Sequence, residues 1–260
     1  MLIPFVKMQA QGNDFVILNA FEHALPELDY AELAAQMCQR RFAIGADGLV
    51  LLMPAEDADA QMIIYNSDGS RAEMCGSALR CVSRLSADHY HKTSLTIATD
   101  SGIKSARVLP GSEGIEVNLG RAKLIHSEFQ VGDFVGDLLD IGNPHYVLWR
   151  EDLSDNPHLA HGAYLEHHSA FSVPVNVHFA QVLSPDEIAM KIWEHACGAT
   201  LACGTGAAST VYSGIKRGLL QSEVKVRVPG GILGIRHQKD SDELLLWGTV
   251  IRAFEGTWKA

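Results

Sequence analysis

Two short segments of this chain share one pattern, in which a cysteine is followed by glycine and further small residues. The first segment is Cys75-Gly76-Ser77-Ala78, and the second is Cys203-Gly204-Thr205-Gly206. Apolar residues at helical spacing follow each segment, so we predict that a helix begins directly after each cysteine. A chain of 260 residues has room for two such halves. We therefore expect two pseudo-symmetric halves with a cleft between them, each placing a thiol at the N-terminus of a helix.

Short apolar runs separated by turn residues surround the two predicted helices, and these runs predict strands in both halves. In the first half the strands are expected at Leu49–Met53, Gln61–Tyr65, Leu95–Ala98, Ala106–Leu109 and Ile115–Leu119. In the second half they are expected at Leu139–Ile141, Tyr146–Trp149, Val175–Val182, Ala189–Trp193, Glu223–Val228 and Leu244–Trp247. Asp29 and Glu32 form a capping box, which predicts one further helix. The chain is thus expected to mix helices and strands.

A thiol at a helix N-terminus has a specific chemistry. The positive end of the helix dipole favours the thiolate, and the unpaired backbone N–H groups bind an anion such as a carboxylate. Two such helix starts would hold an α-carboxylate and place sulfur on either side of the α-carbon. Racemisation needs that arrangement, because one group removes the α-proton and another delivers a proton to the opposite face. Cys75 and Cys203 are therefore predicted to form an acid–base pair that inverts an amino acid without a cofactor.

The composition excludes several other classes of protein. The formal net charge is -10, from 31 acidic and 21 basic residues, whereas nucleic acids and anionic membranes require clustered Lys and Arg. No apolar run is long enough to span a bilayer, and the first residues do not resemble a signal peptide. We expect a cytoplasmic protein with five reduced cysteines and a small-molecule ligand, with a homodimer as the expected form of any self-association.

Structural interpretations of the cysteines stay open at this point. A lone cysteine is more often a small buried apolar residue than a catalyst, and we assign that role to Cys38, Cys81 and Cys197. Cys75 and Cys81, like Cys197 and Cys203, have the spacing C-x5-C, which differs from the shorter spacing of zinc knuckles. We therefore expect no metal site. From spacing alone, Cys75 and Cys203 fit a catalytic pair and mere helix-start residues equally well.

Several further motifs decide between these interpretations. They are Gln11–Phe15, Ile44–Gly48, Tyr65–Ser70, Glu73–Gly76 with Arg80 and Cys81, Gly142–His145, Val175–Val177, Leu201–Ala207 and Pro229–Gly231. In these segments, which occur in the family's order, the chain resembles the diaminopimelate epimerase family over nearly its full length. The resemblance implies an α+β fold of two pseudo-symmetric halves, each a mixed or antiparallel sheet rolled around a central helix, with the active site in the cleft. The halves would comprise residues 1–122, to which a final strand at 250–260 returns, and residues 123–249.

The resemblance also implies roles for individual residues. Cys75 and Cys203 match the two catalytic cysteines, and His145 and Glu194 match residues that help to move the protons of the thiols. Other matched groups would bind the substrate: the amide side chains of Asn13, Asn66, Asn143 and Asn176, and the backbone at Gly76, Ser77, Gly204 and Thr205. The alternatives are a structural role for His145 and turn-forming roles for the four Asn residues, Asn66 above all.

The chain departs from the family pattern at two places. Before the second cysteine the family has Glu-Arg-Gly-x-Gly-Glu-Thr, whereas here His195 takes the place of the Arg and Ala199 that of the second Glu. In the family that Arg pairs with the distal carboxylate of the substrate, and a histidine offers no bidentate fork. Losing such a pair, if buried, would cost roughly 2–5 kcal/mol of binding. At the first cysteine, Ser77 and Ala78 replace the family's Asn-Gly.

Three hypotheses follow. The first is inversion of diaminopimelate (the LL to the meso form) or, with His195 as a marker of changed specificity, racemisation of another amino acid such as histidine. The second is a related isomerase of the phenazine-biosynthesis type, against which the paired cysteines speak. The third is a thiol-based redox or metal-binding protein, which retained zinc would favour.

Overall fold

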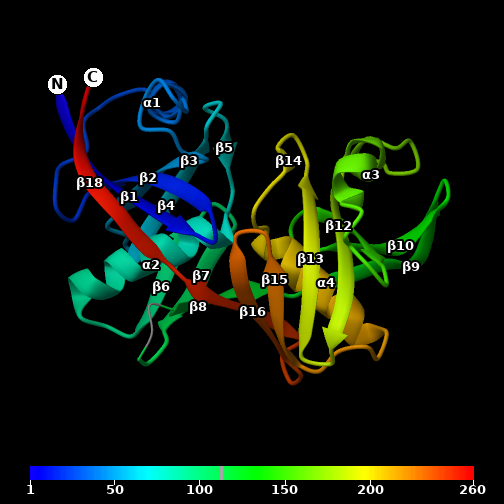
Figure 1. Ribbon diagram of the computed structural model, residues 1–260. Helices are drawn as coiled ribbons and strands as arrows, with labels where there is room; N and C mark the ends of the chain where they lie inside the picture. The colour runs from blue at the N-terminus through cyan, green and yellow to red at the C-terminus, as the bar shows by residue number, and fades with distance from the viewer. Residues whose placement is uncertain (112–113) are drawn as a thin grey trace. The chain divides into compact units, whose positions relative to one another are not determined.

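The computed structural model describes residues 1–111 and 114–260 and divides the chain into two compact units (Figure 1). Unit 1 comprises Met1–Val117 and Gly248–Ala260, and unit 2 comprises Asn118–Trp247. The expected divisions, at 122/123 and 249/250, lie a few residues after the observed ones. Both observed divisions fall inside strands, β8 (Gly114–Gly120) and β17 (Glu243–Thr249). Turn residues in the sequence therefore do not mark them.

The sheet of unit 1 is built from neighbouring strands that are mostly antiparallel. Its order is β18, β1, β2, β3, β4, β6, β7 and β8, and only the β2–β3 and β4–β6 pairs are parallel. The short β5 (Arg71–Ala72) pairs with β4. The other bounds are β1 Leu2–Ala10, β2 Asn13–Asn19, β3 Gly48–Met53, β4 Ala60–Asn66, β6 Ser94–Thr99, β7 Gly102–Val108 and β18 Ile251–Lys259.

Unit 2 repeats this plan with the same succession of strand directions. Its order is β9, β10, β11, β12, β13, β15, β16 and β17, and only β11–β12 and β13–β15 are parallel. The short β14 (Gly198–Ala199) pairs with β13 as β5 does with β4. The other bounds are β9 Lys123–Val131, β10 Phe134–Asp140, β11 Pro144–Trp149, β12 Asn176–Ser184, β13 Glu187–Glu194, β15 Glu223–Val228 and β16 Gly231–Gln238. The expected pseudo-symmetric α+β fold is thereby confirmed.

Each unit has one central helix, α2 (Gly76–Tyr90) in unit 1 and α4 (Gly204–Lys216) in unit 2. In α4, the residues Gly206–Gly214 are all buried, and this run covers more than two turns, so no face of it meets solvent. α2 packs on β1, β2, β4, β6 and β7, and α4 packs on β10, β11, β12 and β16. Figure 1 shows α4 running behind β13 and β15. The helices are rich in Ala, Ser and Gly, which lets the surrounding strands approach closely.

The two outer helices differ in how visible they are in the sequence. α1 (Tyr30–Met37) begins as expected, with Asp29 Oδ1 accepting hydrogen bonds from the backbone N–H groups of Ala31 and Glu32. The carboxylate of Glu32 accepts a bond from Gln36. α3 (Pro157–Glu166) was not predicted, because its buried face includes His158, Gly162 and Glu166 and so gives no apolar periodicity; its N-cap, Asn156, has a left-handed conformation and makes no side-chain capping bond. The exposed strand β9 was missed for want of an apolar run.

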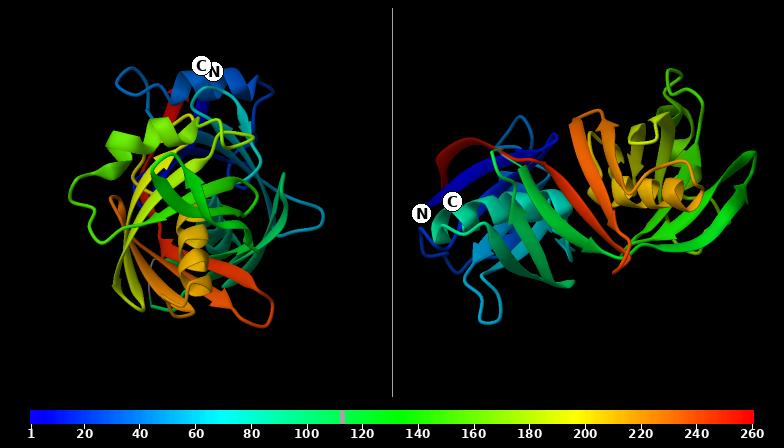
Figure 2. Two further views of the ribbon diagram at one scale, coloured as in Figure 1. Left: turned by 90° about the vertical axis from the view of Figure 1, so that its right-hand side faces the viewer. Right: turned by 90° about the horizontal axis from the view of Figure 1, so that it is seen from below.

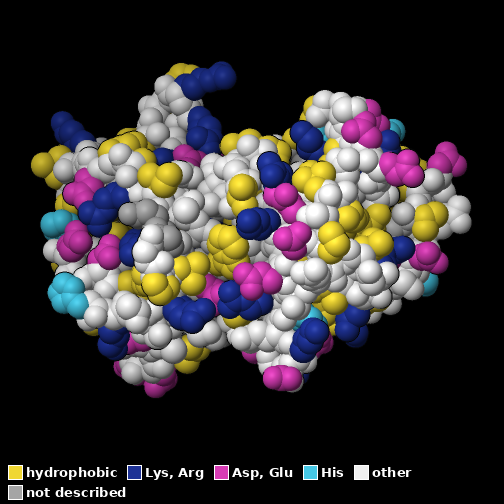
Figure 3. Space-filling view, turned by 60° about the horizontal axis from the view of Figure 1, so that its bottom comes forward, with side chains coloured by type: hydrophobic (Ala, Val, Ile, Leu, Met, Phe, Trp, Pro, Cys, Tyr) yellow, Lys and Arg dark blue, Asp and Glu magenta, His cyan; other side chains and the backbone are white. Residues whose placement is uncertain are grey.

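The first and last strands of the chain pair with each other at one edge of the sheet of unit 1. β1 and β18 are antiparallel, and the terminal residues Met1 and Ala260 exchange two hydrogen bonds, of 2.8 and 3.0 Å (Figure 2). The final strand at 250–260 thus pairs with the first strand of the chain. On the face drawn in Figure 3, acidic and basic side chains are interspersed. Among the described residues, no helix has both the length and the apolar character needed to cross a bilayer.

An ion pair between a buried carboxylate and the partly exposed Arg217 fastens the C-terminal end of α4 to the sheet of unit 2. Asp137 on β10 has a side chain that is only 2% exposed, and it accepts hydrogen bonds from Arg217, Ser213 and the backbone N–H of Glu128. Burial alone would raise the pKa of Asp137, but the bonds from Arg217 and Ser213 outweigh it and lower the pKa below its usual value. The carboxylate therefore stabilises the folded unit.

We predict that Asp137→Ala lowers the free energy of unfolding by about 1–3 kcal/mol, because it removes the charge-assisted hydrogen bonds to Arg217 and Ser213 while Arg217 stays open to water. The exposed Asp133 is the matched control, and Asp133→Ala should change stability by less than about 0.5 kcal/mol. Because the folded-state pKa is depressed, the Asp137 contribution is full above the ordinary carboxyl pKa of about 3.9 and is lost as the pH falls through the folded value. Urea unfolding at pH 7 and below pH 4 measures both effects. An equal loss in the two variants would contradict this account.

Candidate active site

The topology brings the predicted residues of unit 1 to one edge of its sheet. β2 begins at Asn13, its parallel neighbour β3 begins at Gly48, and the antiparallel β4 ends at Asn66, which pairs with Gly48. Cys75 is the N-cap residue of α2, with extended backbone dihedrals (φ -142°, ψ 121°). The Nδ2 group of Asn13 lies 3.8 Å from Cys75 Sγ and donates to it. Asn13 and Cys75 are therefore in contact, as a shared site requires.

The equivalent residues of unit 2 lie at the equivalent edge. Asn143 directly precedes β11, Asn176 begins the parallel β12, and Glu194 ends the antiparallel β13. Cys203 is the N-cap residue of α4, and its backbone (φ -132°, ψ 111°) closely resembles that of Cys75. The two cysteines thus occupy corresponding positions in the two units, as the repeated sequence pattern predicted.

Cys203 is held as a thiol by its surroundings. Its Sγ caps the helix by accepting the Gly206 N–H at 3.4 Å, and Thr205 Oγ1 lies at 3.6 Å. Burial, and then the charge of Glu194 and a hydrogen bond with it, raise the pKa of Cys203 well above its ordinary value. Glu194 Oε1 also accepts a bond of 2.5 Å from Thr200. Glu194 is thus the carboxylate beside this thiol.

His145 lies in a chain of side chains that fixes its protonation. Its Nε2 is 2.9 Å from Asn143 Oδ1, and its Nδ1 is 2.8 Å from Nε2 of the buried His178. An amide oxygen only accepts, so Nε2 of His145 carries the proton, Nδ1 accepts, and His178 donates from Nε2. Burial, and then the neighbouring His178, lower the pKa of His145 well below 6.5, so the ring is neutral. Both of its nitrogens are engaged.

The same region contains a group of side chains whose donor atoms suit a metal ion. One ring nitrogen each of His145 and His178 and the Sγ of Cys203 lie within 4.8 Å of one another, and all three residues are buried. Two imidazoles and a thiolate suit zinc or copper. His145, His178 and Cys203 would be the residues that hold such an ion. Spacing along the chain did not indicate this group, since its members come from three separate elements.

The other predicted amides mainly bind the protein itself. Asn176 donates from Nδ2 to the Pro144 carbonyl at 3.0 Å and accepts the His195 N–H at 3.1 Å, so its amide holds two neighbouring backbone segments together. Asn66 donates to Ser70 Oγ at 2.9 Å within the predicted turn. Ser77 and Gly76 are buried in the first turn of α2, whereas Gly204 and Thr205 at the start of α4 are half-buried.

His195 rests on a buried carboxylate that the sequence did not reveal. Its Nδ1 is 2.7 Å from Glu166 Oε1 at the end of α3, and Glu166 also accepts bonds from Trp193 Nε1 and the Ala196 N–H. Burial alone would raise the pKa of Glu166, but the bonds from Trp193, Ala196 and His195 lower it. His195 is half-exposed, so its Nε2 edge is the part of the ring that is left to meet a ligand.

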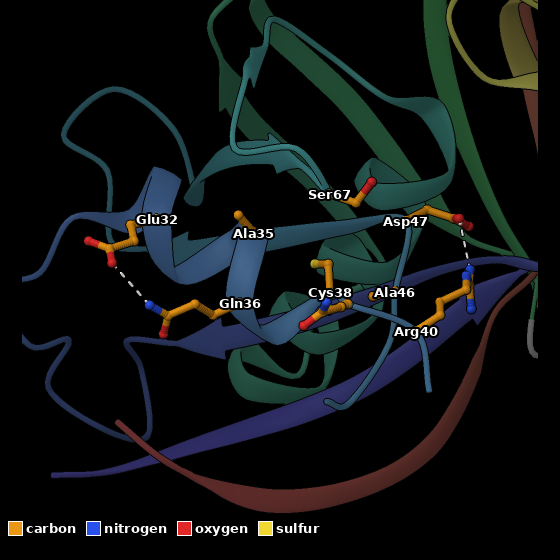
Figure 4. A pocket seen from close by; sticks show the side chains of 9 residues that line it. Glu32, Ala35, Gln36, Cys38, Arg40, Ala46, Asp47 and Ser67 are labelled. Carbon is orange, nitrogen blue, oxygen red and sulfur yellow. Dashed lines mark hydrogen bonds and ion pairs between the residues drawn. The ribbon is translucent and has the colours of Figure 1, made fainter. Parts of the chain in front are cut away.

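Unit 1 also contains a pocket of about 540 Å³ next to the chain neighbours of Asn13 and Asn66 (Figure 4). The pocket is lined by Glu32, Ala35, Gln36, Cys38, Gln39, Arg40, Ala46, Asp47 and Ser67. Arg40 bridges Asp47 and Asp14 with ion pairs of 2.8 and 2.5 Å. None of the predicted site residues lies in its lining. Its bridged charges tie α1 and the following turn to the start of β2.

Solved structures of other proteins share this fold. A phenazine biosynthesis protein of the PhzF family from Bacillus anthracis covers all of both chains with a TM-score of 0.77 at 14% identity. A probable proline racemase from Agrobacterium radiobacter has a TM-score of 0.75 at 15% identity, over 99% of this chain and 93% of that one. A hydroxyproline epimerase from Agrobacterium vitis has a TM-score of 0.73 at 14% identity, over 98% and 92%. Such low identities establish the fold alone.

Sequence relatives give the finer assignment. A diaminopimelate epimerase from Desulforudis audaxviator is 40% identical over 98% of both chains, and one from Heliobacterium modesticaldum is 35% identical over 97% of this chain and 98% of its own. With this fold and these relatives, the chain is an isomerase of the epimerase class. The model of the family described as diaminopimelate epimerase matches residues 5–125 and 138–252, and the chain belongs to that family.

We predict that His145 stays neutral, with its proton on Nε2, between pH 5.5 and 8, because burial and His178 depress its pKa. Long-range ¹H–¹⁵N NMR of the folded protein reports the protonation state of each ring nitrogen. Asn143→Ala removes the acceptor that holds the proton on Nε2 and should release this tautomer, whereas His178→Phe leaves that acceptor in place and should keep it. A His145 ring that is protonated at pH 6, or whose tautomer is the same in Asn143→Ala, would contradict the hydrogen-bond chain.

Proposed function

We propose that this protein inverts the α-carbon of an amino acid without a cofactor, with Cys75 and Cys203 as the acid–base pair. The observation that carries the proposal is their equivalence. Each cysteine is the N-cap residue of the central helix of its unit, at the same place in the strand order. The membership of the chain in the diaminopimelate epimerase family supports the same chemistry.

The proposed reaction consists of two proton transfers on one α-carbon. One sulfur, as thiolate, takes the α-proton from one face, and the other, as thiol, donates a proton to the opposite face. Charge develops on the carboxylate of the substrate as the α-proton leaves. Backbone N–H groups at the helix starts, at Gly76, Ser77, Gly204 and Thr205, are the proposed ligands of that carboxylate.

Two groups beside the thiols are proposed to manage the protons. Glu194 forms a hydrogen bond with Cys203 and can take the proton of this thiol between turnovers. His145 needs to release Asn143 or His178 before either ring nitrogen can exchange a proton, because both are engaged in the structure. Asn143 is the partner that a substrate would replace, since we propose that its amide binds the substrate. Asn13, which contacts Cys75, has the corresponding role in unit 1.

Diaminopimelate is the first proposed substrate, because relatives that are 35–40% identical to this chain are named as diaminopimelate epimerases. The alternative is another amino acid such as histidine. His195 offers one ring nitrogen beyond its bond to Glu166, whereas an arginine would offer a fork that binds a carboxylate with two parallel bonds. Glu166 also places a buried negative charge directly behind His195. This combination favours a substrate whose far end is less anionic than a carboxylate.

A metal-binding protein is the second candidate, favoured by the group formed by His145, His178 and Cys203. The two candidates differ in a direct measurement. A metal-binding protein retains about one equivalent of zinc through purification and dialysis, and its Cys203→Ser variant loses it. An epimerase turns over after complete removal of metal by a chelator.

We predict that Cys75→Ser and Cys203→Ser each lower the turnover number by at least about 10²–10⁴-fold, the usual contribution of one acid–base group. Chiral chromatography of the two stereoisomers measures the rate. Cys197 is exposed and outside the proposed site, and Cys197→Ser is the matched control, with the turnover of the wild type. Near-normal turnover by Cys75→Ser or Cys203→Ser would remove the two-thiol mechanism.

The substrate is tested by loss of the α-proton signal in deuterated buffer, with reductant and without added cofactor. The panel comprises LL-diaminopimelate, L-histidine, L-lysine, L-glutamate and L-arginine. We expect exchange in LL-diaminopimelate or L-histidine. The His195→Gln variant should lower kcat/KM for the accepted substrate by about 5–30-fold, which corresponds to the loss of about 1–2 kcal/mol from one hydrogen bond. Exchange that is indifferent to His195→Gln would show that this residue does not meet the substrate, and exchange in no member would contradict the proposed reaction.

A further inference from the structure

Arg80 is a completely buried cation in the second turn of α2. None of its side chain is exposed, and it is among the largest fully buried side chains of the chain. It donates from Nη1 to Gln11 Oε1 at 2.7 Å, from Nη2 to Ser77 Oγ at 3.4 Å and from Nε to the Gly76 carbonyl at 3.3 Å. All three acceptors are neutral. Over residues 1–111 and 114–260, no carboxylate forms an ion pair with Arg80.

The position of this cation is fixed by its surroundings. Gln11 donates from Nε2 to the carbonyl and the hydroxyl of Thr249, which turns its Oε1 toward Arg80. A Cβ atom at Gly248 would lie 2.3 Å from Arg80 Nη1, so only glycine leaves room for the guanidinium there. Burial lowers the pKa of Arg80 to about 10, and the group therefore stays charged at neutral pH. The guanidinium is a fixed positive charge without a fixed counter-ion.

A buried charge without a partner costs several kcal/mol, so this arrangement needs a compensating anion. Arg80 contacts Gly76 and Ser77, the two residues that directly follow Cys75, and it is the chain neighbour of Cys81, so these are the two thiols nearest to it along the helix. Cys81 is fully buried, and burial raises its pKa to about 12, so it stays a thiol. Cys75 is half-buried and is the N-cap residue of the helix that carries Arg80, where the backbone N–H groups add to the positive potential. Cys75 is the group that can supply the negative charge.

We propose that Arg80 is a positioning residue that holds Cys75 as the thiolate before substrate binds. Glu194 has the opposite effect on Cys203, because a carboxylate beside that sulfur favours the thiol. The two helix starts are alike in backbone and differ in the sign of the charge beside them, a buried guanidinium in unit 1 and a half-buried carboxylate in unit 2. This inference deepens the proposed function, since it decides which thiol is the base and which is the acid in the first turnover.

The proton balance follows from this assignment. The Cα–H bond breaks, and its proton passes to Cys75 Sγ while the electron pair stays on the α-carbon. A new Cα–H bond forms on the opposite face with the proton of the Cys203 thiol. After one inversion Cys75 is the thiol and Cys203 the thiolate, and exchange with solvent restores the resting state. The isomer whose α-proton faces Cys75 is therefore the one that reacts with the resting protein.

The test is the pH dependence of alkylation in the substrate-free protein. Iodoacetamide reacts with thiolates, and peptide mass spectrometry follows Cys75, Cys203 and the exposed Cys197 in one sample. In the wild type we expect the midpoint of Cys75 at the lowest pH, then that of Cys197, and that of Cys203 last. Arg80→Gln should raise the Cys75 midpoint by about 1–3 pH units, the usual effect of an adjacent opposite charge. Arg80→Lys, which keeps the positive charge, should leave the Cys75 midpoint close to that of the wild type.

The matched control is Arg84→Gln, one turn further along α2, where Arg84 faces Asp88 at 3.8 Å near the surface. It should leave the Cys75 midpoint in place. An unchanged midpoint in folded Arg80→Gln, or an equal shift in Arg84→Gln, would overturn the proposal. If Arg80→Gln does not fold, the order of midpoints in the wild type decides, because a Cys75 midpoint at or above that of Cys197 contradicts the assignment.

Alkylation needs no turnover, so this result is independent of the proposed reaction. A shifted midpoint together with no exchange in any amino acid would retain Arg80 as the counter-ion of Cys75 and discard the epimerase mechanism. Turnover together with an unshifted midpoint would retain the epimerase mechanism and discard Arg80 as the counter-ion of Cys75.

Discussion

Each unit of this protein buries most of a helix against its sheet, and that burial imposes a constraint on the start of the helix. The first N–H groups of a helix have no partners within it, and a buried helix cannot leave them all to water. In unit 2 the Cys203 sulfur accepts one of these groups, from Gly206. In each unit the remaining groups at the helix start are donors that can bind an anion such as a carboxylate. The feature that the fold needs for stability is thus the feature that the proposed chemistry uses.

The repeated plan makes the two thiols equivalent, and the charges beside them make them different. Strand order and the backbone at the two N-caps agree between the units. A buried guanidinium, Arg80, stands beside Cys75, and a carboxylate, Glu194, stands beside Cys203. Inversion needs one base and one acid at the same moment, which two identical sites would not supply. A symmetric fold with asymmetric charges fits that requirement.

The sequence predicted what depends on local pattern. The helix starts at Cys75 and Cys203, the capping by Asp29 and most of the buried strands are signalled by residues within a few positions of one another. The helix α3 has a start signal, Asn156 followed by Pro157, but no clear apolar face to support it, since Leu159 within it is exposed. Exposed strands such as β9 escape detection for the same kind of reason.

The missed parts of the site depend on contacts between distant residues. His178 acts on a histidine 33 positions away, Glu166 on one 29 positions away, and Arg80 on Gln11, 69 positions away. A single histidine, glutamate or arginine in a sequence has many ordinary roles, and only the register of the sheets brings these to their partners. The equivalence of the two cysteines and the place of Glu194 beside them were visible in the sequence, whereas the burial of Arg80 without an ion-pair partner was not.

The central claim is that two different groups serve the two faces of one α-carbon, and the fate of the hydrogen tests it most directly. The reaction is run in deuterated water from a single stereoisomer, stopped at low conversion, and the two isomers are separated and analysed by mass spectrometry. The account predicts that the product carries deuterium at the α-carbon, while the recovered starting isomer carries none. Product that retains the original α-hydrogen would show that one group serves both faces and would contradict the account.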